Sequence, residues 1–187
     1  MNEAATSLLD AERFPALSLE QFQAVLARWQ EPHRRWHGRK HLVELLSAIE
    51  NDNDLIEADR EMLRYAALFH DAVYDPLGSE NEEASARLAE EFLPRYARLS
   101  EVVAVILATK SHLGESPLIR KFNDWDCAIL REKAWDKLVD YERGIAFEYR
   151  QVDPAVYRRE RSKFLGASAE TYRNPLLARL ALEVVSG

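Results

Sequence analysis

The stretch LRYAALFHDAVYDP, residues 63–76, places a histidine beside an aspartate at the end of an apolar run. An imidazole and a carboxylate are costly to hold near a hydrophobic core, so His70 and Asp71 need partners. Neighbouring residues on a helix point in directions about 100° apart, and the pair can therefore share one ion only at a helix bend or end. Pro76 is expected to supply that end.

Two further residues are the strongest candidates for partners of this doublet. His41 is followed at helical spacing by Leu45 and Ile49, which places it on or beside a buried stripe. Asp126 leads directly into the apolar segment CAIL, and for that reason we prefer it to Asp124. With the doublet, these side chains offer two nitrogens and two oxygens. Such a mixed donor set suits Mn, Fe, Co, Ni, Zn or, less well, Mg.

The elements that must position these residues are predicted to be helices. Leu, Ala, Glu and Arg are frequent, whereas only 6 Gly and 7 Pro occur in 187 residues, which argues against a turn-rich β architecture. Ser18 and Ser100 are expected helix caps, and Pro154 and Pro175 stand in expected first turns. We expect an all-α fold, a single helical bundle over residues 1–187 with its core in 18–185. Helices are predicted over 18–30, 39–51, 57–74, 81–96, 100–113, 132–152, 153–166 and 174–185, with a short element over 123–131.

Charge and cysteine content exclude several classes of protein. The formal net charge of −7 argues against nonspecific binding to nucleic acid or to anionic membranes. The one cysteine cannot form a disulfide within the chain, and the acidic segment 1–14 lacks the features of a signal peptide. No apolar run reaches the roughly 18 residues of a membrane span. We therefore expect a cytoplasmic protein, and a homodimer stays open.

The ordered set His41, His70–Asp71 and Asp126 in an all-helical chain resembles the HD superfamily of metal-dependent phosphohydrolases. Beyond these residues, the segments EPHRRWHGRKHLVELL, SENEEASARLAEEFL and ILATKSH are similar to one bacterial subgroup, and the resemblance covers roughly residues 18–185. It implies an HD-type helical domain whose four residues hold a divalent metal ion. It further implies hydrolysis of a phosphate ester in a small molecule, with nucleotides as one candidate, through a metal-activated water. Asp71 would act as ligand and base at once.

Five other residues are candidates for contacts with the substrate or for proton transfer. His37 and His112 could support the ligands, bind a second metal or hold a phosphate oxygen. Arg39 and Lys110 could supply positive charge to a phosphate that the carboxylates would otherwise repel. Glu82 could orient a ligand or relay a proton, and we rank it above Asp75, which precedes a proline and is typical of a turn.

Two other functions stay open at this stage. Many superfamily nucleotidases carry a glutamate shortly after the doublet, whereas Ala72, Val73 and Tyr74 follow it here. The identity of the general acid is thus open, and a non-catalytic sensor that binds metal and nucleotide is the main alternative. A helical interaction protein with a chance His–Asp pair is the third.

Overall fold

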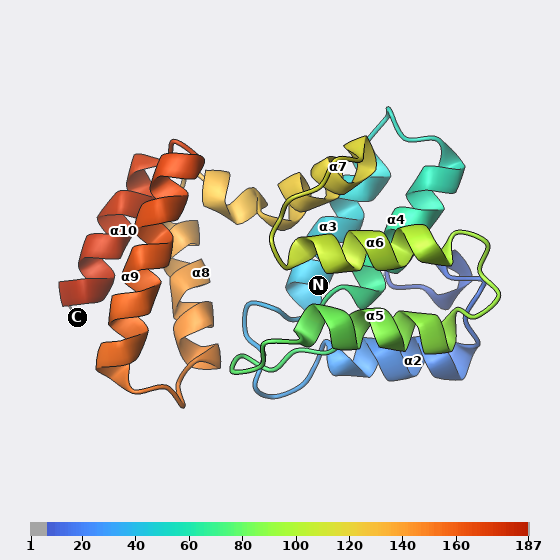
Figure 1. Cartoon of the computed structure of the whole chain (residues 1–187), viewed down its shortest axis with the longest axis horizontal. Helices are drawn as coiled ribbons and strands as arrows, with labels where there is room; N and C mark the ends of the chain where they lie inside the picture. The colour runs from blue at the N-terminus through green and yellow to red at the C-terminus, as the bar shows by residue number, and fades with distance from the viewer. Residues whose placement is uncertain (1–6, 187) are drawn as a thin grey trace. The chain divides into compact units, whose positions relative to one another are not determined.

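The computed structural model describes residues 7–186, and these residues form nine α-helices and two short 3-10 helices with no strand. The predicted all-α class is therefore confirmed (Figure 1). The segment 1–14, in which no signal peptide is expected, includes residues 1–6, and these lie outside the described range. In chain order the elements are η1 (Ala11–Arg13), α2 (Leu19–Arg28), α3 (Arg39–Asn51), α4 (Glu57–Phe69), α5 (Asn81–Phe92), α6 (Leu99–Thr109), α7 (Pro117–Asp126), η2 (Ala128–Arg131), α8 (Trp135–Glu148), α9 (Pro154–Thr171) and α10 (Pro175–Ser186).

Contacts divide the described chain into two compact units. The first unit comprises residues 7–32 and 37–126 and contains η1 and α2 to α7. The second unit comprises residues 33–36 and 127–186 and contains η2 and α8 to α10. Each unit has its own apolar core, so each is described by itself, and the assignment of one domain to 1–187 stays a prediction.

Helix α4 is the centre of the first unit. Every residue from Met62 to His70 is buried, and the helix packs against α2, α3, α5 and α6. Its sequence is apolar on all sides after Glu61, which is the pattern of a helix surrounded by other helices. Arg64 is the charged exception, and it is paired with Glu50 and Glu57. The doublet His70–Asp71 therefore emerges from the most enclosed helix of the unit.

The expected helix over 57–74 is too long, because α4 ends at Phe69. Beyond this point the backbone finds other partners. Val73 N–H donates to the hydroxyl of Ser85, and Asp75 N–H donates to the side-chain oxygen of Asn81. Side chains that offer such bonds compete with helix continuation, so the helix stops before Pro76 is reached.

Other boundaries differ for local reasons. Helix α5 ends at Phe92 and not at Tyr96, since Pro94 follows and cannot donate a backbone hydrogen bond. Helix α6 is capped by Arg98, so the expected Ser100 cap is wrong. Helix α7 begins at Pro117 within an expected loop, and proline is well suited to the first position of a helix. The Ser18 cap is confirmed, with a reciprocal bond to Gln21.

The second unit is built from η2 and three longer helices, of which α9 and α10 pack closely together (Figure 1). Both begin at a proline, as predicted. The carboxylate of Glu148 accepts hydrogen bonds of 2.6 Å from the backbone N–H groups of Arg35 and Trp36, which anchors the segment 33–36 within this unit. Among the helices of residues 7–186, none is both long and apolar enough to span a bilayer.

Candidate metal centre

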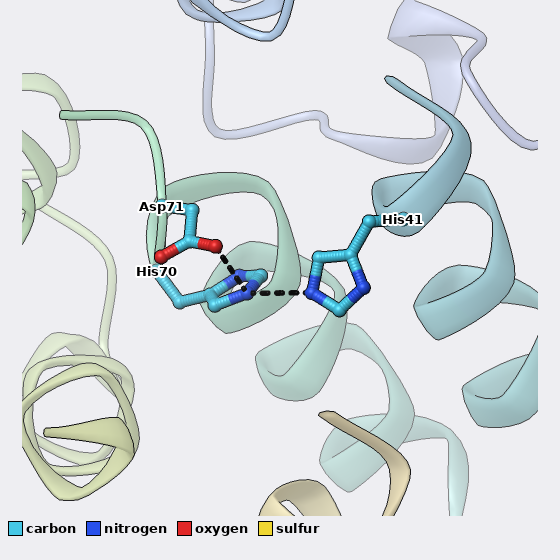
Figure 2. A group of neighbouring side chains, drawn as sticks. All are labelled: His41, His70 and Asp71. Carbon is cyan, nitrogen blue, oxygen red and sulfur yellow. Dashed lines mark hydrogen bonds and ion pairs between the residues drawn. The ribbon is translucent and has the colours of Figure 1, made fainter. Parts of the chain in front are cut away.

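Four side chains from three helices converge in the first unit. His41 Nε2 lies 3.3 Å from His70 Nε2 and 3.0 Å from Asp126 Oδ1. His70 Nε2 is also 3.4 Å from Asp71 Oδ2 and 3.6 Å from Asp126 Oδ1. Figure 2 shows the His41 ring projecting from α3 toward the His70 ring. The carboxylate of Asp71 approaches the His70 ring from the side away from His41. The structure thus brings together all four residues that the sequence selected as ligands.

Each residue reaches the cluster from a defined position on its helix. His41 lies in the first turns of α3 on its buried face, together with Leu42 and Leu45. His70 is the C-cap of α4, and Asp71 follows it outside the helix. This placement lets two consecutive side chains face one region, as the expectation of a helix end requires. Asp126 is the last residue of α7.

The orientation of the His70 ring favours a metal ligand. Its Nδ1 atom lies 2.9 Å from the carbonyl oxygen of Ala67, which can only accept a hydrogen bond. Nδ1 therefore carries the proton, and in the neutral ring the lone pair belongs to Nε2, which points into the cluster. A ligating histidine is commonly fixed in this way by a carbonyl or carboxylate on its other nitrogen.

The charges of the cluster have large effects on proton binding. Burial alone would lower the pKa of His70, but the adjacent Asp71 carboxylate, together with Asp126, raises the pKa to about 9. Burial alone would raise the pKa of Asp126, yet hydrogen bonds from His112, His41 and His70 hold this pKa well below its usual range. The carboxylates of Asp71 and Asp126 therefore favour a positive charge on the histidines beside them.

These residues fit a divalent cation. A tight group made of His41, His70 and Asp71 has one ligand atom from each within 4.8 Å of the others, and Asp126 Oδ1 contacts both rings. Two imidazole nitrogens with two carboxylate oxygens form a donor set used by Zn²⁺ and by Mn²⁺, Fe²⁺, Co²⁺ and Ni²⁺. A cation would satisfy the facing nitrogens, only one of which can carry a proton between them at 3.3 Å.

Exposure to solvent differs among the four residues of the cluster. The His70 side chain is 1% exposed and the His41 side chain 7%, whereas Asp126 is 11% and Asp71 18% exposed. The imidazoles thus form the inner wall, and Asp71 is the residue nearest to solvent.

His112 joins the cluster through a hydrogen bond with Asp126. Its Nε2 lies 3.1 Å from Asp126 Oδ2, the oxygen that does not contact His41. The residue is exposed and has a φ of 53°, in the left-handed region, shortly after α6 ends. Histidine tolerates this region better than most residues, and here the turn directs the imidazole to α7. The predicted role as a supporting residue fits this position.

His37 and Arg39 lie at the start of α3 with different surroundings. The His37 ring is 6.2 Å from the His41 ring and 4.6 Å from that of Tyr74, measured between centroids. Arg39 stands in the first turn of the helix, and its Nε atom is buried without a hydrogen-bond partner among residues 7–186. The structure therefore brings His37 beside the proposed ligand His41, while among residues 7–186 no contact joins Arg39 to the cluster.

Lys110 and Glu82 belong to a separate group of charges. Lys110 Nζ donates to the Ser79 carbonyl at 2.7 Å, is paired with Glu83 and lies 3.8 Å from Glu82. The pairing fastens the loop before α5 to the end of α6. No contact of the described residues joins this group to the metal cluster, so the roles expected for Lys110 in phosphate binding and for Glu82 in proton relay stay predictions.

Three aromatic residues that contact the histidines of the site were not predicted from the sequence to do so. The rings of Trp29 and Phe122 lie 5.4 Å and 5.6 Å from the His70 ring and enclose it in apolar surface. Tyr74 contacts His37, as described above. Trp29 and Phe122 have the helical spacing of ordinary core residues, and only the packing of α2, α4 and α7 identifies their role. Tyr74 gave a stronger signal, because it follows the doublet by three positions.

Comparison with family models, with curated proteins and with solved structures gives no match for this chain. The resemblance to the HD superfamily thus stays a prediction, and the function has to be argued from the residues themselves.

Proposed function

We propose that the chain is a metal-dependent phosphohydrolase of the HD type that acts on a small phosphorylated molecule. The observation that carries the proposal is the convergence of His41, His70, Asp71 and Asp126, which the sequence separates by up to 85 positions. Two buried imidazoles with two carboxylates are the donor set that the resemblance to HD phosphohydrolases implies, and such donors can hold a divalent cation. Nucleotides are one class of candidate substrate, and we propose a cytoplasmic location.

The position of each residue in the cluster suggests its role. His41, His70 and Asp126 would hold a cation, and His112 contacts the second oxygen of Asp126. When bound, a divalent cation lowers the pKa of a coordinated water toward neutrality and polarises a phosphoryl oxygen. Asp71, the most exposed of the four side chains, would act as the base in this chemistry.

The alternative is a sensor in which the same residues bind metal and nucleotide without turnover. One observation favours it: Asp75, the first acid after the doublet, accepts a bond from Leu77 N–H in a turn and is thereby engaged in local structure. A helical protein with a chance His–Asp pair would have no affinity for metal at all. Metal content therefore separates this third function from the other two.

The experiment has two stages on the full chain. Metal content is first measured by elemental analysis after purification and after loading with Mn, Mg, Co or Ni. Hydrolysis is then assayed with each metal on nucleotides and on simple phosphate mono- and diesters. We expect about one bound divalent ion per chain and metal-dependent release of phosphate from at least one ester.

The Asp71→Asn variant is the direct test of the assigned chemistry, because it removes a ligand and the base together. We expect loss of both bound metal and hydrolysis. Asp75→Asn is the matched control, since asparagine can form the same turn with Leu77 N–H, and this variant should keep both. Normal turnover in Asp71→Asn would refute the proposed mechanism, and bound metal without turnover on any ester would support the sensor.

A further inference from the structure

Two aromatic rings stand beside the metal cluster without being ligands. The rings of His37 and Tyr74 lie 4.6 Å apart with an angle of 32° between their planes, which is close to a stacked arrangement. The His37 ring is in turn 6.2 Å from the ring of the ligand His41. Both residues of the pair are only half-buried, so part of its surface is open to solvent.

The surroundings of Tyr74 differ from those of its neighbour Val73. The side chain of the preceding residue, Val73, packs against the core of the first unit, whereas Tyr74 is not among the residues packed against it. Tyr65, by contrast, is fully buried in that core. Tyr74 contacts the ring of His37, which directly precedes the cap of the ligand-bearing helix α3.

The backbone on both sides of Tyr74 is fixed by side chains of α5. The hydroxyl of Ser85 accepts from Val73 N–H at 3.0 Å and donates to its carbonyl at 3.3 Å. The amide of Asn81 accepts from Asp75 N–H at 2.9 Å and donates to its carbonyl at 2.8 Å. Asn81 and Ser85 are four positions apart and therefore share one face of the helix. Four bonds thus fix the backbone on both sides of the residue that carries the Tyr74 ring.

We propose that the Tyr74–His37 pair is a stacking wall that binds a planar aromatic group carried by the phosphorylated ligand. The His37 ring of this wall lies 6.2 Å from the His41 ring. A ligand with its phosphate at the cluster would therefore bring an adjacent ring to Tyr74 and His37. Rings prefer stacked or edge contacts with other rings over contacts with saturated groups of similar size. The inference rests on the proposed function only for the phosphate-binding role of the cluster.

The test compares two ligands of the same size that differ in planarity. Phenylphosphonate and cyclohexylphosphonate cannot be hydrolysed, and their binding to the manganese-loaded full chain is measured by calorimetry. We expect wild type to bind the phenyl compound about 3- to 10-fold more tightly. Tyr74→Phe keeps the ring and should keep this ratio, whereas Tyr74→Leu should reduce it to about one.

A second variant guards against loss of folding in Tyr74→Leu. Asn81→Ala leaves Tyr74 in the chain but frees one side of its backbone, and it should lower the ratio while bound manganese stays constant. Equal affinity of wild type for both phosphonates, or binding of neither, would overturn the inference. If phosphate esters are hydrolysed but wild type binds both phosphonates equally well, only the stacking wall is overturned and the proposed hydrolase stands. A phenyl preference without turnover on any ester would overturn only the proposed hydrolase and leave the stacking wall supported.

Discussion

The Nε2 atoms of His41 and His70 lie 3.3 Å apart, although 29 positions separate the two residues in the sequence. Two ring nitrogens at this distance can share one proton at most, and both rings are buried. A carboxylate oxygen of Asp126 lies 3.0 Å from the first nitrogen and 3.6 Å from the second. A positive charge between these atoms, from a shared proton or a metal ion, is thus stabilised from three sides.

Replacement of Asp126 by asparagine should abolish tight metal binding. The amide keeps the size of the side chain but removes the negative charge and one anionic donor. Loss of a group that merely supports a ligand costs about 10- to 100-fold in affinity, and loss of a ligand should cost more than about 100-fold. Titration of the purified variant with Mn²⁺ by calorimetry measures the change.

Asp124→Asn is the matched control for this prediction. Asp124 is the acid two positions earlier on α7, it is exposed, and the sequence alone offered it as an alternative ligand. Its replacement should leave metal affinity within about twofold of wild type, as expected for a surface substitution. A large loss in Asp124→Asn with little change in Asp126→Asn would show that the cluster has been assigned to the wrong carboxylate.

His112 should support metal binding through its hydrogen bond to Asp126. Because its φ of 53° suits glycine, His112→Gly removes the imidazole without imposing backbone strain. We expect metal affinity to fall about 10- to 100-fold while the free energy of unfolding without metal stays within about 1 kcal/mol of wild type. His112→Asn tolerates the same backbone conformation and should recover part of the affinity if its amide reaches Asp126.

The control for His112 is the other non-glycine residue of positive φ in the described chain. Arg173 has a φ of 48° in the second unit, between α9 and α10. Arg173→Gly makes the same backbone change in the other unit, which holds none of the four proposed ligands, and should leave metal affinity unaltered. Equal losses in both variants would mean that backbone freedom, and not the imidazole, accounts for the effect.

Much of this arrangement could be predicted from the sequence because its signals are local. Apolar spacing and the composition gave the all-α class, and α3 was predicted with its observed bounds. Ser18 and the two prolines marked helix starts by the bonds they can make or lack. His41 was placed on a buried face by Leu45 and Ile49, and that face indeed packs against α4.

The remainder depended on contacts between distant segments. The end of α4 at Phe69 is set by Ser85 and Asn81, which belong to another helix. With Pro76 as the only local signal, the helix was predicted to reach Tyr74, five residues beyond its observed end. The ring contact of Tyr74 with His37 likewise joins segments that no periodic pattern relates. Lys110 was expected near a phosphate, and its pairing with Glu83 comes from the packing of α5 on α6.

Glu148 should be a major source of stability in the second unit. Its side chain is 1% exposed, and one carboxylate oxygen accepts both backbone N–H bonds from Arg35 and Trp36. Glu148→Ala leaves two donors without this acceptor, each at a cost of about 1–3 kcal/mol, so we expect a loss of about 2–6 kcal/mol in the free energy of unfolding. Urea unfolding followed by tryptophan fluorescence measures it.

Glu148→Gln separates the hydrogen bonds from the charge. The glutamine oxygen can accept the same two bonds, and the loss should be less than half of that in the alanine variant. Glu160→Ala, at an exposed position of α9, should change stability by no more than about 0.5 kcal/mol. A glutamine variant as unstable as the alanine variant would contradict the role given to these bonds.

Glu50 should stabilise the first unit in a way that depends on pH. Burial alone would raise its pKa, but hydrogen bonds from Arg64 and Arg13, with their charges, lower it below the ordinary value. Arg64 Nε lies 2.5 Å and Arg13 Nη2 2.6 Å from Glu50 Oε1. A carboxylate with a lowered pKa contributes its full stability above the unfolded pKa of about 4.3, and the contribution disappears as the pH falls through the folded pKa.

Glu50→Gln should therefore be about 1–2 kcal/mol less stable than wild type at pH 7, at the low end for a charged hydrogen bond because part of the side chain is exposed to solvent. The difference should be constant from pH 7 to about pH 5 and shrink at lower pH, as urea unfolding at each pH would show. Glu44→Gln is the control, since its pair with Lys40 is exposed and should contribute little at any pH. A difference that grows toward acid pH would contradict the pairing of Glu50 with the two arginines.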